Sequence, residues 1–150
     1  MNKAGENDGN WLAIDYGERT IGLAVAHILT GSARPLDPVK NTSIEGVDKA
    51  LSEQIRQWRP SRIVVGLPLD GEGNDTAMSR KVRTFANRLA ELAPQVQISL
   101  HDERLSSDAA AAEFARRRNQ GRARRSDAAR LDSMAAALIL DSWIREHGHA

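Results

Sequence analysis

Three carboxylates lie in stretches of the sequence that are otherwise apolar or regular. Asp15 stands within the apolar run WLAIDY, Glu103 follows an alternating run over residues 96–101, and Asp132 lies in the apolar segment AARLDSMAAALIL. A helix as apolar as the one expected around Asp132 has to be largely buried. Because burial of a lone charge is very costly, Asp132 and Asp15 both need a partner.

These acids come from separate elements and could converge at one edge of a sheet, since ligand sites in open α/β sheets lie beyond the carboxyl ends of the strands. Unaided, the acids would repel one another, and some would take up a proton. One or two divalent cations would remove this repulsion, and oxygen ligands without cysteine suit Mg²⁺ or Mn²⁺. Such ions clamp the attacking and leaving oxygens of a phosphoryl displacement.

Each acid also has an ordinary structural explanation. Asp15 could cap a turn or form an ion pair with Arg19. Glu103 could be a surface acid, and Asp132 could pair with a neighbouring arginine. The spacing alone leaves the metal site and these structural roles open.

The periodicity of the apolar residues predicts a mixed β-sheet. Residues 11–16 and 21–27 alternate around a Gly-Glu-Arg turn, which indicates an antiparallel hairpin. A third strand near 34–44 is expected at an edge of the sheet, because it contains two prolines. The β-branched run 62–66 and the alternating run 96–101 indicate later, parallel strands. The small residues of the second strand, which are Gly22, Ala24 and Ala26, should let another element pack closely on their face.

Apolar residues at helical spacing predict helices between and after the later strands. Pro60 and Pro94 end the first two helices, and a cap at Ser126 or Asp127 begins the last one. The four expected helices cover about residues 47–58, 78–92, 107–121 and 126–147. The fold class is therefore α/β, with a mixed sheet that is antiparallel at its start, parallel later, and flanked by helices.

Length and composition predict a single domain. The chain has 150 residues, enough for one core and too few for two full-sized domains. Residues 1–10 are polar and are expected to be a disordered lead-in, with residues 11–147 as the one domain. The absence of cysteine excludes disulfides and thiolate metal sites. With neither a signal peptide nor a long apolar run in the sequence, we expect a cytoplasmic protein without a membrane partner.

One basic segment is concentrated in a chain whose net charge is only +1. Residues 116–125 read RRRNQGRARR and contain no acid. A solvated face is one explanation, but so dense a positive charge favours sequence-independent contact with a nucleic-acid backbone. The arginines of this segment are Arg116, Arg117, Arg118, Arg122, Arg124 and Arg125.

Four motifs follow one another along the chain. They are IDYGERTIGLAV (14–25), VVGLPL (64–69), DERLSS (102–107) and LDSMAAALIL (131–140). Together they resemble the YqgF/RuvX family, the pre-16S rRNA nucleases once grouped with Holliday junction resolvases, over about residues 11–145. The resemblance implies a ribonuclease H-like fold, which agrees with the pattern of a hairpin followed by parallel strands. Ser106 and Ser107 replace threonines that are common in the family after DERL.

The resemblance also implies the chemistry. It assigns Asp15, Glu103 and Asp132 as catalytic acids that bind Mg²⁺ or Mn²⁺, by their places in the first-strand, DER and last-helix motifs. The implied activity is that of a metal-dependent endonuclease that hydrolyses phosphodiesters of structured nucleic acid. The implied process is 5′-end maturation of the 16S rRNA precursor.

Further residues are expected to support this site. Arg19 and Arg104 could hold a phosphate or orient a carboxylate, or be ordinary surface charges. Gly17 is expected to allow a close backbone approach at the first turn, for which a purely conformational role is an equal explanation. Gly66 and Pro68 are expected to shape the loop beside the site.

Other functions remain open from the sequence. A nuclease acting on branched DNA, as a Holliday junction resolvase does, would use the same acids and the same basic surface. The first motif also resembles the phosphate-binding motif of actin-like ATPases and sugar kinases, which need a second subdomain that a chain of this length lacks. A catalytically silent nucleic-acid-binding protein would have no reason to bear the repulsion of three acids.

Overall fold

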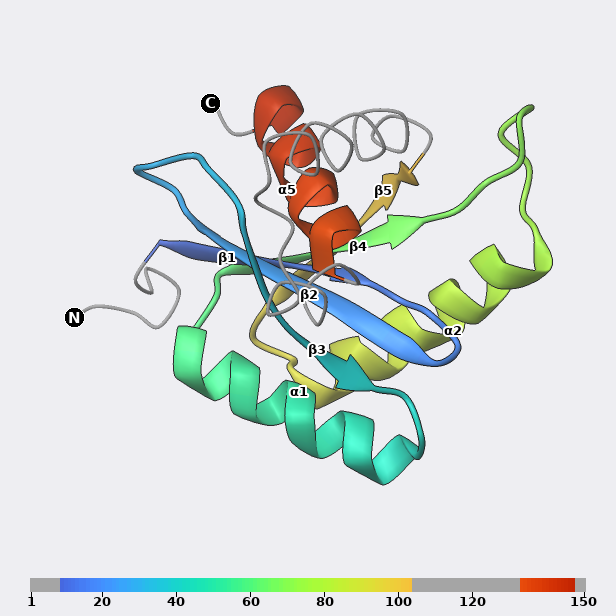
Figure 1. Ribbon diagram of the computed structural model, residues 1–150, viewed down its shortest axis with the longest axis horizontal. Coiled ribbons are helices and arrows are strands. Elements are labelled where there is room, and N and C mark those ends of the chain that lie inside the picture. Colours follow the sequence, from blue (N-terminus) through green and yellow to red (C-terminus); the bar gives the residue numbers. More distant parts are fainter. Residues whose placement is uncertain (1–8, 104–132, 148–150) are drawn as a thin grey trace, which may run out of the picture.

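A five-stranded sheet with helices on both sides forms the body of the protein (Figure 1). The computed structural model describes residues 9–103 and 133–147. The strands lie in the order β3-β2-β1-β4-β5, and their bounds are β1 Asn10–Asp15, β2 Thr20–His27, β3 Arg34–Lys40, β4 Arg62–Leu67 and β5 Gln97–Asp102. The described helices are α1 Ile44–Trp58, α2 Ala77–Leu92 and α5 Met134–His147. This is the mixed α/β sheet flanked by helices that the sequence predicts.

The strand directions confirm the predicted hairpin and the later parallel strands. β1 pairs antiparallel with β2, so that Asp15 lies opposite Gly22. β4 runs parallel to β1 on its other side, and β5 runs parallel to β4. β3 lies at the edge, antiparallel to β2, as expected for a strand that contains Pro35 and Pro38 and whose register with β2 shifts once.

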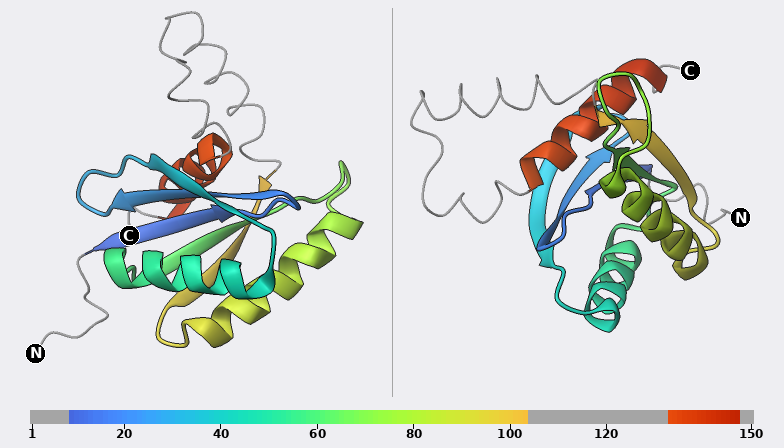
Figure 2. Two further views of the ribbon diagram at one scale, coloured as in Figure 1. Left: turned by 60° about the horizontal axis from the view of Figure 1, so that its bottom comes forward. Right: turned by 90° about the vertical axis from the view of Figure 1, so that its right-hand side faces the viewer.

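Helices α1 and α2 cover one face of the sheet, and α5 lies on the other (Figure 2). The α1/α2 face is built from large aliphatic residues, among them Ile14, Val65 and Leu89, which are all almost fully buried. Side-chain hydroxyls cap both helices, since Ser43 accepts from the N–H of Gly46 and Thr76 accepts from that of Ser79. This face therefore forms the main hydrophobic core.

The α5 face is narrower and is built from small residues. Ala13, Ala24 and Ala26 pack against Ile139 and Leu140 of α5, all of them buried. The prediction that the small residues of β2 admit a closely packed element is confirmed. Because the strands contribute only alanine methyl groups at these positions, α5 packs closely on β1 and β2.

Polar contacts hold α5 in one position on this face. The Leu23 N–H of β2 donates to the hydroxyl of Ser133, with 3.0 Å between nitrogen and oxygen, at the start of the helix. In the middle of the helix, Asp141 accepts from the Ala33 N–H at 2.9 Å, and the Ser142 hydroxyl lies 2.9 Å from Nε2 of His101. Hydrophobic packing is non-directional, so these bonds fix the register of the helix.

Several predictions reach beyond the described residues. The helix expected over 107–121 and the expected start of the last helix at Ser126 or Asp127 lie outside them. β1 begins at Asn10, which pairs with His27, so this residue of the expected lead-in belongs to the sheet. Within residues 9–103 and 133–147, no helix combines the length and apolar character needed to cross a membrane.

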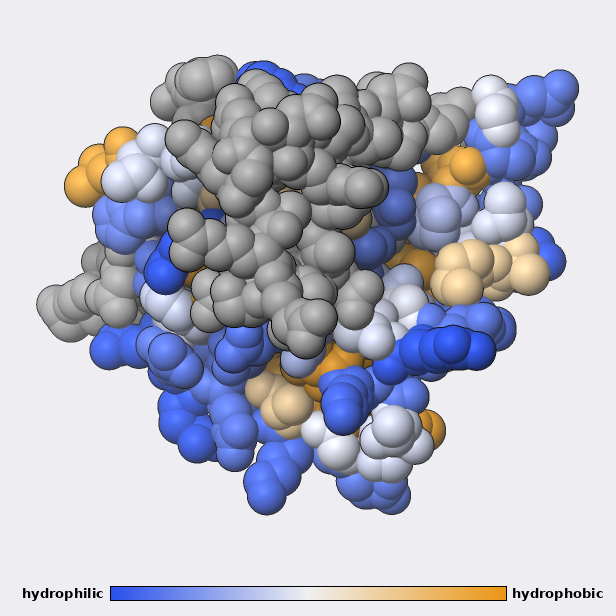
Figure 3. Space-filling view, in the orientation of Figure 1, coloured by the Kyte–Doolittle hydropathy of each residue, from blue (hydrophilic) through white to orange (hydrophobic). Residues whose placement is uncertain are grey.

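The outer surface is mainly hydrophilic on the side shown in Figure 3, with a hydrophobic patch at its left edge. The turn between β2 and β3 exposes Ile28 and Leu29, the latter to 87%. This turn projects from the sheet at the end opposite to the β1–β2 turn (Figure 1).

Candidate active site

Asp15 ends β1 on the side of the sheet that α5 covers. Side chains alternate along a strand, and Ala13 packs under α5 whereas Leu12 and Ile14 belong to the core under α1 and α2. The carboxylate of Asp15 is therefore at the margin of an apolar face, as the strand parity predicts. It lies opposite Gly22, which has no side chain to cover it.

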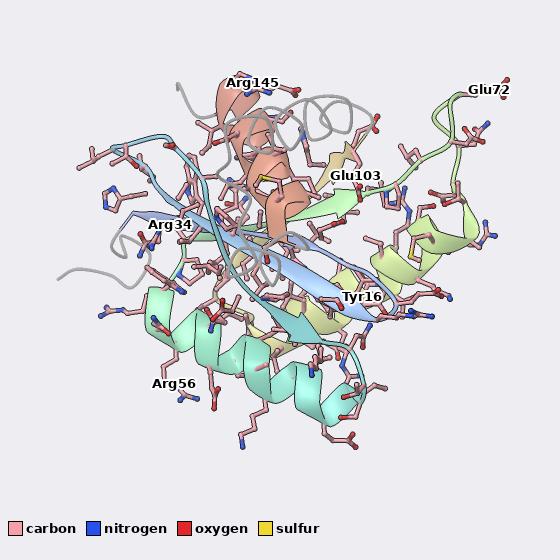
Figure 4. All side chains as sticks on the ribbon, in the orientation of Figure 1. Tyr16, Arg34, Arg56, Glu72, Glu103 and Arg145 are labelled. Atoms are coloured by element: carbon pink, nitrogen blue, oxygen red, sulfur yellow. The ribbon has the colours of Figure 1, made fainter. Side chains whose placement is uncertain are left out.

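Glu103 directly follows the last residue of β5 and lies over Gly66 of β4. A Cβ added to Gly66 would lie 3.0 Å from both Cγ and Oε2 of Glu103 and 2.5 Å from Cδ1 of Ile139. Glu103 and the α5 side chain of Ile139 thus use the space that the missing side chain of Gly66 leaves. In Figure 4, Glu103 is labelled beside the lower part of α5.

The surroundings of Glu103 disfavour its charged form. Burial, then the nearby charge of Asp15, then that of Asp102, raise its pKa from an ordinary value of 4.5 to about 7. Ile14 of β1 pairs with Val65 of β4, so the next residues, Asp15 and Gly66, are neighbours at the ends of these strands, and Glu103 lies over Gly66. The two carboxyl groups therefore lie at one site. A pair of acids held close in a partly apolar site is typical of a catalytic or metal-binding centre.

Two of the three predicted acids are thus brought together, and the third, Asp132, lies outside the described residues. Asp132 immediately precedes Ser133, which is fully buried and bonded to the Leu23 N–H. Leu23 is next to Gly22, the register partner of Asp15. In the described part of the chain, no three His, Asp or Glu residues form a group that could hold a metal.

Gly17 is required for a close approach. A Cβ on Gly17 would lie 2.4 Å from the carbonyl oxygen of Thr20, which no side chain permits. The carbonyl of Gly17 also accepts a 2.9 Å hydrogen bond from the side-chain amide of Asn41, which ties the turn after Asp15 to the end of β3. The close backbone approach expected at Gly17 is present in this turn.

Pro68 lies in the loop that leaves β4. Its carbonyl oxygen accepts a 3.1 Å hydrogen bond from the hydroxyl of Thr76, the residue that caps α2. Within the loop, the Asp70 carboxylate accepts from the N–H groups of Glu72 and Asn74. The loop is therefore closed on itself by hydrogen bonds at the same edge of the sheet as Asp15.

The predicted basic residues are largely untested by the structure. Arg19 is exposed in the β1–β2 turn, and its carbonyl accepts from the Asn41 N–H at 2.9 Å. The other predicted nucleic-acid-binding residues lie outside the described residues; they are Arg104, Arg116, Arg117, Arg118, Arg122, Arg124 and Arg125.

Two contacts of this site escaped the sequence analysis. Ile139 was one apolar residue among many, although its side chain shares the space over Gly66 with Glu103. Ser133 looked like an ordinary polar residue, although its side chain is buried and bonded to a strand 110 residues away. The alternation of β4, which puts Gly66 on the same face as Val64 and α5, is the one sequence signal that pointed to the first contact.

Comparison with known proteins relates the chain to nucleases. The family model described as "RuvX: Holliday junction resolvase" matches residues 9–146. Relatives provisionally named pre-16S rRNA nucleases include one of Edwardsiella ictaluri, 44% identical over 88% of this chain and 91% of its own length. One of Xanthomonas axonopodis pv. citri is 43% identical, covering 91% of this chain and 88% of its own length.

Solved structures share the fold at low sequence identity. RuvC of T. thermophilus in complex with a Holliday junction substrate superposes with a TM-score of 0.58 at 23% identity, covering 93% of this chain and 96% of that one. The Holliday junction resolvase of fowlpox virus gives a TM-score of 0.56 at 10% identity, covering 91% and 98% of the two chains. The predicted ribonuclease H-like fold is thereby confirmed. With its fold, its paired carboxyl groups and a family match along nearly its whole length, the chain belongs to the RuvX (YqgF) family of nucleases.

Proposed function

We propose that this protein is a divalent-metal-dependent endonuclease that hydrolyses phosphodiesters of structured nucleic acid. The observation that carries the proposal is the meeting of Asp15 and Glu103 at the carboxyl ends of β1 and β5, on the side of the sheet covered by α5. Two carboxyl groups in one partly buried site are costly when both are ionised. A cation bound between them would offset that cost and give the pair a chemical use.

The residues present fit a hard divalent cation. Their donor atoms are carboxylate oxygens, the ligands that Mg²⁺ and Mn²⁺ prefer. Asp15, Glu103 and, as a third ligand, Asp132 would hold the metal, and Asp132 is bonded directly to Ser133, whose hydroxyl is fixed on β2. When bound, the metal would supply Lewis-acid activation of water and of the phosphate oxygens.

The chain itself would orient these groups. Gly66 gives Glu103 room to lie against β4, and the apolar side chain of Ile139 shares the space over Gly66. Gly17 and Pro68 hold the β1–β2 turn and the loop after β4 in closed conformations at the same edge. A carboxylate held in this way loses little freedom when it binds its ligand.

Basic residues would hold the nucleic-acid backbone. Arg19 and Arg104 are next to the acid motifs, and the arginine-rich segment 116–125 supplies further positive charge. Such contacts are independent of base sequence and weaken as salt rises. They would position a strand, while the acids act on one of its phosphodiesters.

The substrate that the relatives' names favour is the precursor of 16S rRNA, in maturation of its 5′ end. Such an activity would act in the cytoplasm. The description of the family model and the fold shared with RuvC favour branched DNA as the second candidate. Both substrates would use the same acids.

Cleavage assays test this proposal. The wild-type protein should cut a precursor carrying the 16S 5′ leader with Mg²⁺ or Mn²⁺ and not with a chelator, and should cut a four-way DNA junction more slowly. Asp15→Asn should lower the rate at least about a thousandfold, because a lost metal ligand removes several kcal/mol of transition-state stabilisation. The control Asp75→Asn, in an exposed ion pair with Arg83, should leave the rate unchanged. Equal rates for Asp15→Asn and the wild type would refute the proposal.

A further inference from the structure

A pocket opens beside the candidate active site on the opposite face of the sheet. Its volume is about 270 Å³, and it is lined by the β1–β2 turn, the first turns of α1 and the middle of α2. Tyr16 lines it and is the residue next to Asp15 in the chain. The pocket and the candidate site therefore meet at the end of β1, one on each side of the sheet.

Aromatic and apolar side chains form the walls of this pocket. The rings of Tyr16 and Phe85 are in contact, with 4.9 Å between their centroids and a tilt of 39°. Ile44, the first residue of α1, lies at the pocket and is 58% exposed. A large aliphatic side chain left in water at a pocket with an aromatic wall is suited to contact a flat, apolar ligand group.

Two positively charged side chains line the pocket beside these walls. Lys81 and Arg88, two turns apart on α2, both line it. Each is in an ion pair, Lys81 with Glu18 and Arg88 with Asp48, and both cations are about half exposed. The Lys81–Glu18 pair is exposed on both sides and contributes little to stability, so a phosphate can replace the Glu18 carboxylate at low cost. Arg88 is held more firmly, by two hydrogen bonds to Asp48. An aromatic wall beside the exchangeable cation of Lys81 matches the face and the phosphate of a nucleotide.

We infer that this pocket binds one unstacked base of the nucleic-acid strand, next to the phosphodiester held at the acid site, with its phosphate near Lys81. This inference rests on the proposed function in one respect, which is that a nucleic-acid strand lies at the acid site. The pocket's volume is just below the range of about 300–1,000 Å³ for drug-sized ligands, which suits a single base. Stacking on an aromatic ring is open to every base, because every base has a π-face. The preferred substrate therefore has an unpaired nucleotide beside the cut.

Binding without divalent metal, where no cleavage takes place, tests the pocket apart from the nuclease activity. Single-stranded oligouridine and oligodeoxythymidine are compared with a fully paired duplex by fluorescence anisotropy. Tyr16→Ala should weaken single-strand binding by about fivefold to a hundredfold, the effect of losing one stacked base, and leave duplex binding unchanged. Tyr16→Phe, which keeps the ring, should retain wild-type affinity.

Surface variants keep the test valid if Tyr16→Ala does not fold. Ile44→Ser should weaken single-strand binding by about threefold through lost apolar contact, whereas Leu29→Ser, at an even more exposed aliphatic residue in the β2–β3 turn, should not. Lys81→Met should reduce the slope of log affinity against log salt by about 0.7, the effect of one lost phosphate contact on a single strand. Arg83→Met, in another exposed pair on α2, should leave the slope unchanged.

Photocrosslinking locates the base directly. Oligonucleotides with 5-iodouridine should crosslink to Tyr16, and mass spectrometry of the digested complex identifies the residue. A crosslink at Tyr16 together with the loss of affinity supports the inference, and the RNA and DNA strands show which sugar the pocket accepts. Crosslinks elsewhere, with unchanged affinity in Ile44→Ser and Lys81→Met, overturn it even if the protein cleaves through Asp15.

Discussion

The two faces of the sheet are built in different ways. The face under α1 and α2 buries large aliphatic side chains, and its helices are capped and carry their charges outside. The face under α5 is lined by alanines and glycine, carries buried serines, and ends in two carboxyl groups, where burial and then the charge of Asp15 raise the pKa of Glu103. One face supplies stability, and the other gives up apolar burial to hold polar groups in place.

The first prediction concerns a substitution in the core under α1 and α2. Leu89 of α2 is 1% exposed in the main core. Leu89→Ala should lower the free energy of unfolding by about 3 kcal/mol, because it removes a buried side chain and leaves a cavity. Denaturant unfolding measures the loss, and the metal affinity of the folded variant should stay at the wild-type value. A large loss of metal affinity would show that the two faces are not separable.

The second prediction concerns a substitution that adds a side chain in the space over Gly66 on the α5 face. In Gly66→Ala the new methyl group overlaps Ile139 and lies at 3.0 Å from Glu103. We expect a loss of about 2–3 kcal/mol in stability from overpacking and at least about a tenfold loss of Mn²⁺ affinity, since Glu103 is displaced. In the control Gly71→Ala, the added methyl group meets no atom within 4 Å. Equal Mn²⁺ affinity in Gly66→Ala and its control would contradict the placement of Glu103.

The third prediction concerns pH. In metal-free protein the pKa of Glu103 is about 7, against 4.5 in the unfolded chain. The folded state therefore holds the proton more tightly, and stability should fall as pH rises from about 4.5 through 7. The fall is about 2 kcal/mol, after discounting for the exposed part of the side chain.

Glu103→Gln measures this effect, since it should remove the decline and stabilise the metal-free protein at pH 8 but not at pH 4. Chemical denaturation at several pH values, with exposed Glu91→Gln as the matched control, gives the comparison. An unchanged pH profile in Glu103→Gln would mean that another group is responsible.

The fourth and smallest effect concerns the register of α5. Ser133→Ala leaves the buried Leu23 N–H without its acceptor and should cost about 1 kcal/mol. It should also weaken Mn²⁺ binding, because the start of α5 is no longer fixed beside Asp15. Asp141→Ala removes a similar bond to Ala33 in the middle of the helix, two turns away from Ser133, and should leave Mn²⁺ binding unchanged. Isothermal titration of both variants distinguishes a fixed start of the helix from general loosening.

The sequence predicts those features that depend on local pattern. Alternation located the hairpin and put Asp15 at its margin, and the prolines marked β3 as an edge strand. Glu103 could be placed at the end of β5 because the alternating run stops there. These predictions succeed because a strand's period and a proline's missing N–H act within a few residues.

Contacts between distant segments could not be predicted in this way. The bond from Leu23 to Ser133 and the position of Ile139 over Gly66, beside Glu103, depend on how α5 lies on the sheet. The apolar residues around Ser133 predict a buried helix, but they do not indicate which backbone group its hydroxyl contacts. The pocket at Tyr16 likewise joins α1, α2 and a turn, and it exists only once all three are packed.

Mn²⁺-dependent thermal unfolding tests the central claim, that Asp15 and Glu103 are brought together to bind a divalent cation. At a hundredfold excess of Mn²⁺ over its dissociation constant, the wild-type protein should gain about 2.7 kcal/mol of stability. Asp15→Asn should gain almost none at the same concentration, while Asp75→Asn should behave as the wild type. An equal gain in Asp15→Asn and the wild type would contradict the claim.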